Sequence, residues 1–100
     1  MPPGGEAMAE EAALRRILVI ANSRGLHARA AAKFVKTVGA FDAEITVRKD
    51  DIEVSGLSIM GLMMLAAGQG CEIELIASGR QAAEAIEAIT VMVVGKFDET

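Results

Sequence analysis

Residues 41–48 and 71–77 alternate apolar with mostly polar side chains, and this pattern constrains the fold more than any other feature. A period of two is typical of a strand that buries one face and exposes the other. Strands of a parallel sheet are covered on both faces and are apolar throughout. The sequence therefore predicts a mostly antiparallel sheet with helices on one face and water on the other. The apolar positions of the two stretches are Phe41, Ala43, Ile45, Val47, Cys71, Ile73, Leu75 and Ala77.

The remaining segments complete the order strand, helix, strand, strand, helix, strand, helix. Residues 16–21 form a β-branched apolar run typical of a strand, and residues 52–54 continue the alternation, with Ile52 and Val54 inward, after a turn at 49–51. Helices are predicted at 28–38, 58–66 and 81–94. The apolar face of the first helix is expected at Ala28, Ala31, Ala32, Val35 and Val38. The fold class is α+β: an open-faced two-layer sandwich, βαββαβα, with a four-stranded antiparallel sheet and three helices on one face.

The length of 100 residues indicates one domain. Residues 1–13 hold both prolines, two glycines and three glutamates, and we expect a disordered N-terminal tail there, with Met8 as an alternative start. The domain is predicted at residues 14–95, and residues 96–100 are expected to form a C-terminal tail.

Charge and cysteine content exclude several function classes. The net charge is −4 and no basic cluster exceeds two adjacent residues, which argues against a nucleic-acid partner. The single cysteine, Cys71, excludes an intrachain disulfide and is expected to be a small buried hydrophobe. No signal peptide is visible, and the apolar runs are far shorter than the ~20 residues that span a bilayer. We expect a monomeric cytoplasmic protein that does not insert into membranes.

His27 is the only histidine of the chain, and it stands where the first strand leads into the first helix. Helix N-termini present unpaired N–H groups and partial positive charge, which favour phosphate. Arg29 adds a permanently charged guanidinium that suits phosphate oxygens. Imidazole is a good nucleophile near neutral pH. The segment therefore indicates a phosphohistidine at His27 with Arg29 as a phosphate ligand.

Other readings of His27 remain open at this point. A lone histidine near a helix start is often an ordinary surface residue. Metal binding is disfavoured because no second histidine or cysteine pair is present, and no metal or other cofactor is expected. A catalytic triad would need a nucleophile and an orienting acid at positions that the sequence does not signal.

Two segments resemble the HPr family, the histidine-containing phosphocarriers of the bacterial phosphotransferase system. Residues 25–29, Gly-Leu-His-Ala-Arg, resemble the active-site signature, and residues 58–61, Ser-Ile-Met-Gly, resemble the regulatory-serine segment. His27 and Ser58 are 31 positions apart, as in the family. The resemblance extends from about Arg15 to Val94, and the family fold is the same βαββαβα sandwich.

The resemblance implies a stoichiometric phosphocarrier rather than an enzyme. Enzyme I, phosphorylated from phosphoenolpyruvate, would transfer its phosphoryl group to Nδ1 of His27, near the first helix and Arg29. The carrier would then phosphorylate an EIIA-type protein. The acidic balance, the methionine-rich helix and Ala30 favour the nitrogen-related branch over sugar uptake.

Two residues near the histidine depart from the family pattern. Ala30 replaces the usual proline, and we expect altered rigidity with retained function. Arg24 replaces a small polar residue, and it is either a solvated loop charge or a second phosphate ligand.

Ser58 precedes a helix that is too apolar for an amphipathic surface helix. Ser58 is expected to be its N-cap and, by the resemblance, a substrate for an HPr kinase/phosphorylase, although Leu57 replaces a basic residue found in some relatives. Some of the apolar side chains must face solvent or a partner, and methionine suits surfaces that bind several partners. The predicted docking residues for Enzyme I and the acceptor are Leu57, Met60, Met63 and Met64.

Two other functions are compatible with this fold class. A non-catalytic regulatory module of the same fold would bind partners according to its phosphorylation state, but relatives of that kind lack the histidine. An amino-acid-sensing α+β domain would leave the pairing of His27 with Arg29 unexplained.

Overall fold

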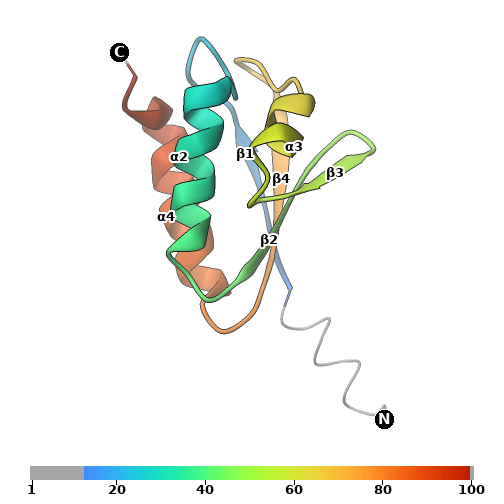
Figure 1. Cartoon of the computed structure of the whole chain (residues 1–100), viewed down its shortest axis with the longest axis vertical. Helices are drawn as coiled ribbons and strands as arrows, with labels where there is room; N and C mark the ends of the chain where they lie inside the picture. The colour runs from blue at the N-terminus through green and yellow to red at the C-terminus, as the bar shows by residue number, and fades with distance from the viewer. Residues whose placement is uncertain (1–12, 100) are drawn as a thin grey trace.

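The fold was obtained as a computed structural model, in which residues 13–99 are described (Figure 1). The predicted N-terminal tail therefore lies outside the described residues except for Ala13. The elements follow the predicted order. They are β1 Leu14–Val19, α2 Ala28–Gly39, β2 Glu44–Lys49, β3 Ile52–Ser55, α3 Ile59–Met64, β4 Glu72–Ser78, α4 Ala82–Val94 and a final turn, η1, at Lys96–Asp98.

The four strands form one antiparallel sheet in the order β1-β4-β2-β3. Leu75 of β4 is opposite Arg16 of β1 on one side and Val47 of β2 on the other. The first strand therefore lies beside the last one. Beyond the paired strands, the N–H of Ile20 donates to the carbonyl of Cys71 at 2.9 Å, which ties loop 20–27 to the segment before β4.

The alternation in the strands separates a core face from an open face, as predicted. The inward side chains of the two central strands are buried, while Ile17 and Val19 of β1 are exposed on the other side. In Figure 1, α2 and α4 lie side by side over one face of the sheet. The inward residues of β2 and β4 are Ile45, Val47, Ile73, Leu75 and Ala77. The fold is thus the open-faced two-layer sandwich that the pattern predicts.

The buried face of α2 is rotated from the predicted one. Ala28 and Ala32 are exposed, and Phe34 lies at the centre of the buried face. The alanine run does not define a face, because alanine is tolerated on both sides of a helix, whereas the large Phe34 side chain must be buried. The buried residues of the helix are Ala30, Ala31, Phe34 and Val38.

Two further side chains are more exposed than predicted. Cys71 is only half-buried, because it precedes β4 and packs at the margin of the core. Ile52 is exposed, because it follows the hairpin turn on the edge strand β3. The methionine helix α3 is also shorter than predicted: Ser58 is its N-cap and Leu65 its C-cap.

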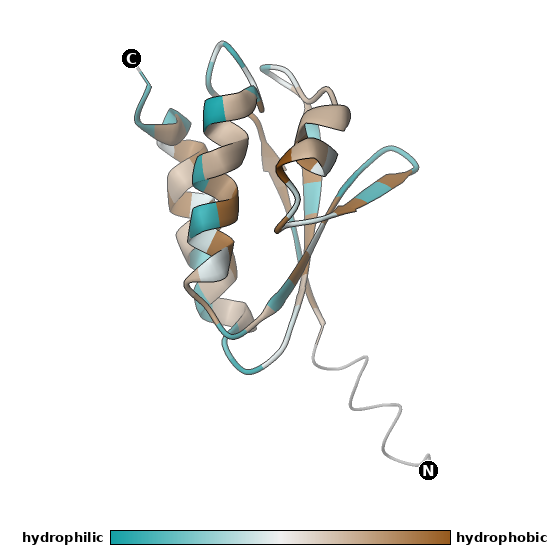
Figure 2. Ribbon diagram, viewed as in Figure 1, coloured by the Kyte–Doolittle hydropathy of each residue, from teal (hydrophilic) through white to brown (hydrophobic). Residues whose placement is uncertain are grey.

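The chain positions three segments at one end of the molecule. Loop 20–27 leads into the N-terminus of α2 there, α3 lies nearby, and the segment after α4 ends at the same place (Figure 1). Figure 2 shows that α3 is apolar along most of its ribbon, whereas polar positions recur along α2. This end of the molecule contains His27.

Candidate functional site

His27 is the N-cap residue of α2. Its backbone is extended, with φ −72° and ψ 177°, and its side chain makes no capping hydrogen bond. The N–H of Ala31 donates to the His27 carbonyl at 2.8 Å and so begins the helical ladder. The preceding N–H groups, those of residues 28–30, have no partner within the helix, as at any helix N-terminus. The imidazole therefore stands at a helix end that favours an anion.

Gly25 allows the loop before His27 to pack closely against the chain before β4. Its φ is +67°, and a Cβ at this position would lie 2.4 Å from the carbonyl oxygen of Ala67. The neighbouring N–H of Leu26 donates to that same oxygen at 3.0 Å. Any other residue at position 25 would both strain the backbone and push the loop away. The glycine of the signature therefore positions His27.

The imidazole of His27 contacts a carboxylate from the other end of the chain. Nε2 of His27 lies 2.5 Å from Oε2 of Glu99, and both side chains are 16% exposed. Asn22, which is buried, donates from Nδ2 to Oε1 of Glu99 at 3.0 Å and to the carbonyl of Gly25 at 2.8 Å. One carboxylate thus bridges the histidine and the loop that precedes it.

These contacts favour the ionised form of the carboxylate. The hydrogen bond with His27, followed by that with Asn22, lowers the pKa of Glu99 below its usual value of 4.5. Partial burial opposes this shift, and electrostatic attraction from His27 and Arg24 adds to it. Glu99 is therefore an anion throughout the neutral pH range.

The segment that holds Glu99 is folded, although residues 96–100 were predicted to be a tail. Phe97 is fully buried, and Lys33 of α2 donates from Nζ to the Phe97 carbonyl at 2.6 Å. Lys96, Phe97 and Asp98 have φ values of 61°, 54° and 63°. A left-handed backbone costs about 1–2 kcal/mol per non-glycine residue. Burial of a phenylalanine side chain offsets part of that cost. The sequence does not show this packing, because a lone aromatic residue after a helix does not indicate where its side chain packs.

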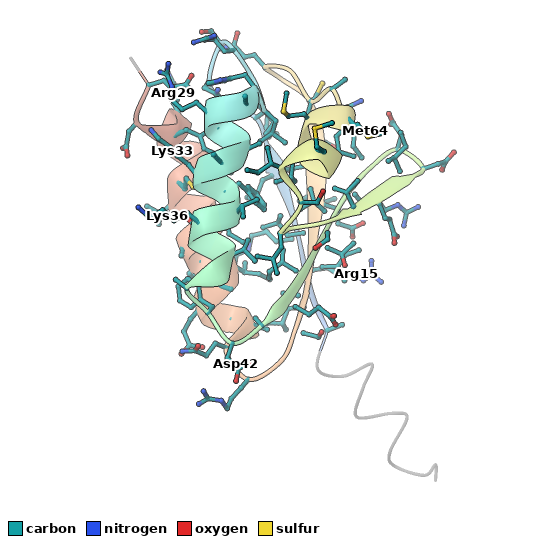
Figure 3. The ribbon with its side chains drawn as sticks, viewed as in Figure 1. Arg15, Arg29, Lys33, Lys36, Asp42 and Met64 are labelled. Atoms are coloured by element: carbon teal, nitrogen blue, oxygen red, sulfur yellow. The ribbon has the colours of Figure 1, made fainter. Side chains whose placement is uncertain are left out.

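Basic side chains surround the anion-binding end of α2. A surface hollow beside the helix start is lined by Arg24, Arg29 and Lys33 together with Ser23, Asp98 and Glu99. Figure 3 shows Arg29, Lys33 and Lys36 along one side of α2. Arg29 and Arg24 are both exposed, so either guanidinium can reach a group in this hollow. The structure thus brings Arg24 and Arg29 together near His27.

Ala30 occupies a fully buried position in the first turn of α2. Its methyl group packs in the core, and its N–H is one of the unpaired donors of the helix end. A proline at this position would lack that donor.

Ser58 caps α3 as predicted. Its Oγ accepts a hydrogen bond from the N–H of Gly61 at 2.9 Å. A Cβ on Gly61 would lie 2.9 Å from Cβ of Val54, so glycine lets α3 approach β3 closely. The second motif therefore fixes how the methionine helix sits on the sheet.

Five apolar side chains at α3 face solvent: Ile59, which is 40% exposed, and the four predicted docking residues. Leu57 is 58% exposed, Met60 69%, Met63 40% and Met64 71%. We call these four residues the α3 surface; Figure 3 labels Met64 on it. Met63 and His27 line the same surface hollow, together with Arg24, Leu26 and residues 66–68. The predicted exposure is confirmed, and the α3 surface adjoins the histidine.

A family model described as the PTS HPr component phosphorylation site matches residues 14–94. The chain belongs to the HPr family. Members of this family are phosphocarriers of the phosphotransferase system, and this assignment confirms the resemblance seen in residues 25–29 and 58–61.

Relatives within the HPr family match almost end to end. A phosphocarrier protein HPr from Neisseria meningitidis serogroup A is 49% identical over 86 residues, which cover 86% of this chain and 97% of the relative. A phosphocarrier protein NPr from Shewanella violacea is 44% identical over 86 residues, which cover 86% of this chain and 94% of the relative. Both HPr-named and NPr-named proteins are thus close to this chain.

Solved HPr structures share the fold. HPr-C-His from Thermoanaerobacter tengcongensis has a TM-score of 0.83 at 41% identity and covers 87% of this chain and 98% of its own. An HPr dimer from the same organism has a TM-score of 0.70 at 44% identity, and the match covers 82% of this chain and 94% of the chain in that structure. Within residues 13–99, no helix has the length and apolar character needed to cross a membrane.

Sequence reasoning missed Asn22 and Glu99. Neither lies in a family motif quoted above, and no spacing rule links residue 99 to residue 27. The only available signal was Phe97, since an aromatic residue in a short polar terminus has a reason to fold back onto the domain.

Proposed function

We propose that this HPr family member accepts a phosphoryl group from phosphorylated Enzyme I on Nδ1 of His27 and transfers it to an EIIA-type protein. The observation that supports this most is the position of His27 as the N-cap of α2, with unpaired N–H groups behind it and Arg29 beside it. In this proposal the chain is a stoichiometric carrier rather than an enzyme, because it transfers one phosphoryl group at a time between two other proteins and converts no substrate of its own.

The proposed transfer is an in-line displacement at phosphorus. The lone pair of Nδ1 forms a bond to phosphorus while the bond to the donor atom of Enzyme I breaks, and that electron pair leaves with the donor. Transfer to the acceptor reverses the roles: the acceptor atom bonds to phosphorus, and the Nδ1–phosphorus pair returns to the imidazole. No metal or other cofactor is required by this sequence of steps.

Arg29 is proposed to stabilise the transferring group. Its guanidinium lies beside the helix start and can donate to phosphate oxygens as a fork. The backbone N–H groups of the first turn of α2, including that of Ala30, provide further donors. Arg24 is a second basic side chain in the same hollow.

The α3 surface is proposed to dock Enzyme I and the acceptor. It is apolar, exposed and adjacent to His27 through the hollow that Met63 shares with the histidine. Methionine side chains adapt to several partners because they are unbranched and flexible. A single surface can therefore serve both the donor and the acceptor.

Phosphorylation of Ser58 by an HPr kinase/phosphorylase is proposed as a regulatory step. Ser58 is partly accessible and lies next to Leu57 and Met60. A phosphate there would place about two negative charges at the edge of the α3 surface. Desolvating these charges against an apolar partner would weaken docking.

The relay is proposed to operate in the cytoplasm, with this chain as a monomer. The nitrogen-related branch is the proposed pathway, and the NPr relative supports it. The experiment that tests the function is incubation with purified Enzyme I and phosphoenolpyruvate. We expect acid-labile, base-stable phosphate on this chain, and its transfer to an EIIA-type protein. No labelling with active Enzyme I would contradict the proposal.

A further inference from the structure

The carboxylate that contacts His27 comes from the C-terminal segment. Oε2 of Glu99 lies 2.5 Å from Nε2 of His27, and its Oε1 accepts from Nδ2 of the buried Asn22 at 3.0 Å. Asn22 is itself held by its hydrogen bond to Gly25. The carboxylate is therefore fixed in place on its other side and is not a mobile surface group.

The chain around Glu99 is anchored as well. Phe97 is buried two residues earlier, and its carbonyl accepts from Lys33 of α2. The left-handed turn at Lys96–Asp98 directs the chain back toward the start of α2. The fold thus maintains an unusual backbone conformation while presenting one carboxylate to the imidazole.

We propose that Glu99 is a positioning residue for phosphotransfer: it accepts a hydrogen bond from Nε2–H of His27 and so leaves the lone pair on Nδ1. In a neutral imidazole one nitrogen carries the proton and the other accepts. A carboxylate within hydrogen-bond distance of Nε2 favours the proton on that nitrogen. This inference rests on the proposed function, since it concerns how His27 becomes a nucleophile at Nδ1.

The proposed role balances charge without moving a proton. When Nδ1 bonds to phosphorus, the imidazole keeps its Nε2–H and gains one positive charge. The Glu99 carboxylate then faces a cationic ring across the same hydrogen bond, which strengthens it. When the phosphoryl group leaves, the electron pair returns to Nδ1 and the ring is neutral again.

Other charges near the ring do not offer a second acceptor for Nε2. Arg24 from the loop, and Arg29 and Lys33 from α2, are donors, and Asp98 lies in the same hollow as Glu99 but is exposed. On the side of α3, the described residues that share a hollow with His27 and Leu26 are Arg24, Met63 and residues 66–68. Arg24 is a donor, and the others are uncharged. Glu99 is thus the carboxylate that the geometry assigns to this role.

The test compares Glu99→Ala with Glu84→Ala, which removes the same charge from an exposed position in the first turn of α4. The first readout is the tautomer of His27, measured by nitrogen-15 NMR of the unphosphorylated protein at about pH 8.5, where free imidazole is neutral. We expect Nε2–H to predominate in the wild type and in Glu84→Ala, and both tautomers to be present in Glu99→Ala.

The second readout is the phosphotransfer rate at saturating Enzyme I. We expect Glu99→Ala to be about tenfold slower or more, because it loses a charge-assisted hydrogen bond that strengthens in the transition state. Glu99→Gln, which still offers an acceptor oxygen, should recover part of the rate. Glu84→Ala should match the wild type.

Two results would overturn the proposal. An unchanged tautomer ratio in Glu99→Ala means that the carboxylate does not set the proton position, and a wild-type saturated rate in that variant means that positioning has no effect on transfer. The NMR readout requires no phosphate donor. If the wild-type chain accepts no phosphate, the proposed function fails while the tautomer measurement still stands.

Discussion

Nζ of Lys33 in α2 donates a 2.6 Å hydrogen bond to the carbonyl oxygen of Phe97, 64 residues further along the chain. This bond joins the helix that begins at His27 to the segment that presents Glu99. The fully buried ring of Phe97 fixes the same segment from the core side. The C-terminal turn is therefore packed as part of the domain and contributes a residue beside His27.

Phe97→Ala should destabilise the protein and disturb the site together. Truncating a buried phenylalanine typically costs about 3–5 kcal/mol, because the cavity is only partly refilled. Urea unfolding measures this loss, and Lys96→Ala, an exposed change in the same turn, is the control. Equal unfolding free energies for the two variants would show that the turn does not pack as described.

His27→Ala should fold normally and accept no phosphate. The imidazole lies outside the apolar core, so the protein should still fold, and the free energy of unfolding should fall only by the lost contact with Glu99. Labelling from phosphoenolpyruvate through Enzyme I measures the loss of acceptor. Labelling equal to the wild type would place the phosphoryl group on another residue.

Arg29→Ala should slow transfer without abolishing it, because the nucleophile remains. One charge-assisted contact is worth roughly 1.5–3 kcal/mol, which corresponds to about 10- to 150-fold in rate if it is made in the transition state. Rapid-quench phosphotransfer kinetics provide the measurement. The control is Lys36→Ala, which removes an exposed cation further along the same helix and should transfer at nearly the wild-type rate. If Arg29→Ala also transfers at the wild-type rate, Arg29 is an ordinary solvated charge.

Ser58→Asp should weaken docking of Enzyme I while the fold is retained. A negative charge at the start of α3 is compatible with the helix dipole, but it adjoins the α3 surface. We expect a higher Enzyme I concentration for half-maximal transfer and a smaller change in the saturated rate.

Ser58→Ala separates the capping role from the charge. It removes the acceptor for the Gly61 N–H and should cost about 1 kcal/mol of stability, with normal phosphotransfer. If Ser58→Asp transfers phosphate like the wild type, then Ser58 is a helix cap only and the α3 surface is not the Enzyme I interface.

Acid should release the contact between Glu99 and the site. The hydrogen bonds from His27 and Asn22 lower the pKa of Glu99 in the folded protein, so its contribution is fully present above the ordinary value of 4.5 and is lost as the pH falls through the lowered value. Urea unfolding at about pH 6 and about pH 3 should show a smaller acid-dependent loss for Glu99→Gln than for the wild type. Equal losses in the two proteins would mean that Glu99 is not stabilised by these partners.

The period-two pattern of residues 41–48 and 71–77 was sufficient to predict the sheet, because the burial of alternate residues is a local property of a strand. The signature around His27 and the cap at Ser58 were equally visible, since each lies within a few consecutive residues. The buried face of α2 was wrongly assigned, because a run of alanines fits either face and only the packing of Phe34 selects one.

The sequence by itself determined the order of strands and helices, the place of His27 between the first strand and the first helix, and the exposure of apolar side chains at α3. The tertiary structure alone decided that Glu99 and Asn22 belong to the site. The pairing of β1 with β4 brings loop 20–27 to the end of the sheet where α4 terminates, and burial of Phe97 turns the last residues back onto α2. His27 and Glu99 are 72 residues apart in the sequence, so their contact depends on how whole elements pack. No local sequence pattern predicts that these two side chains meet.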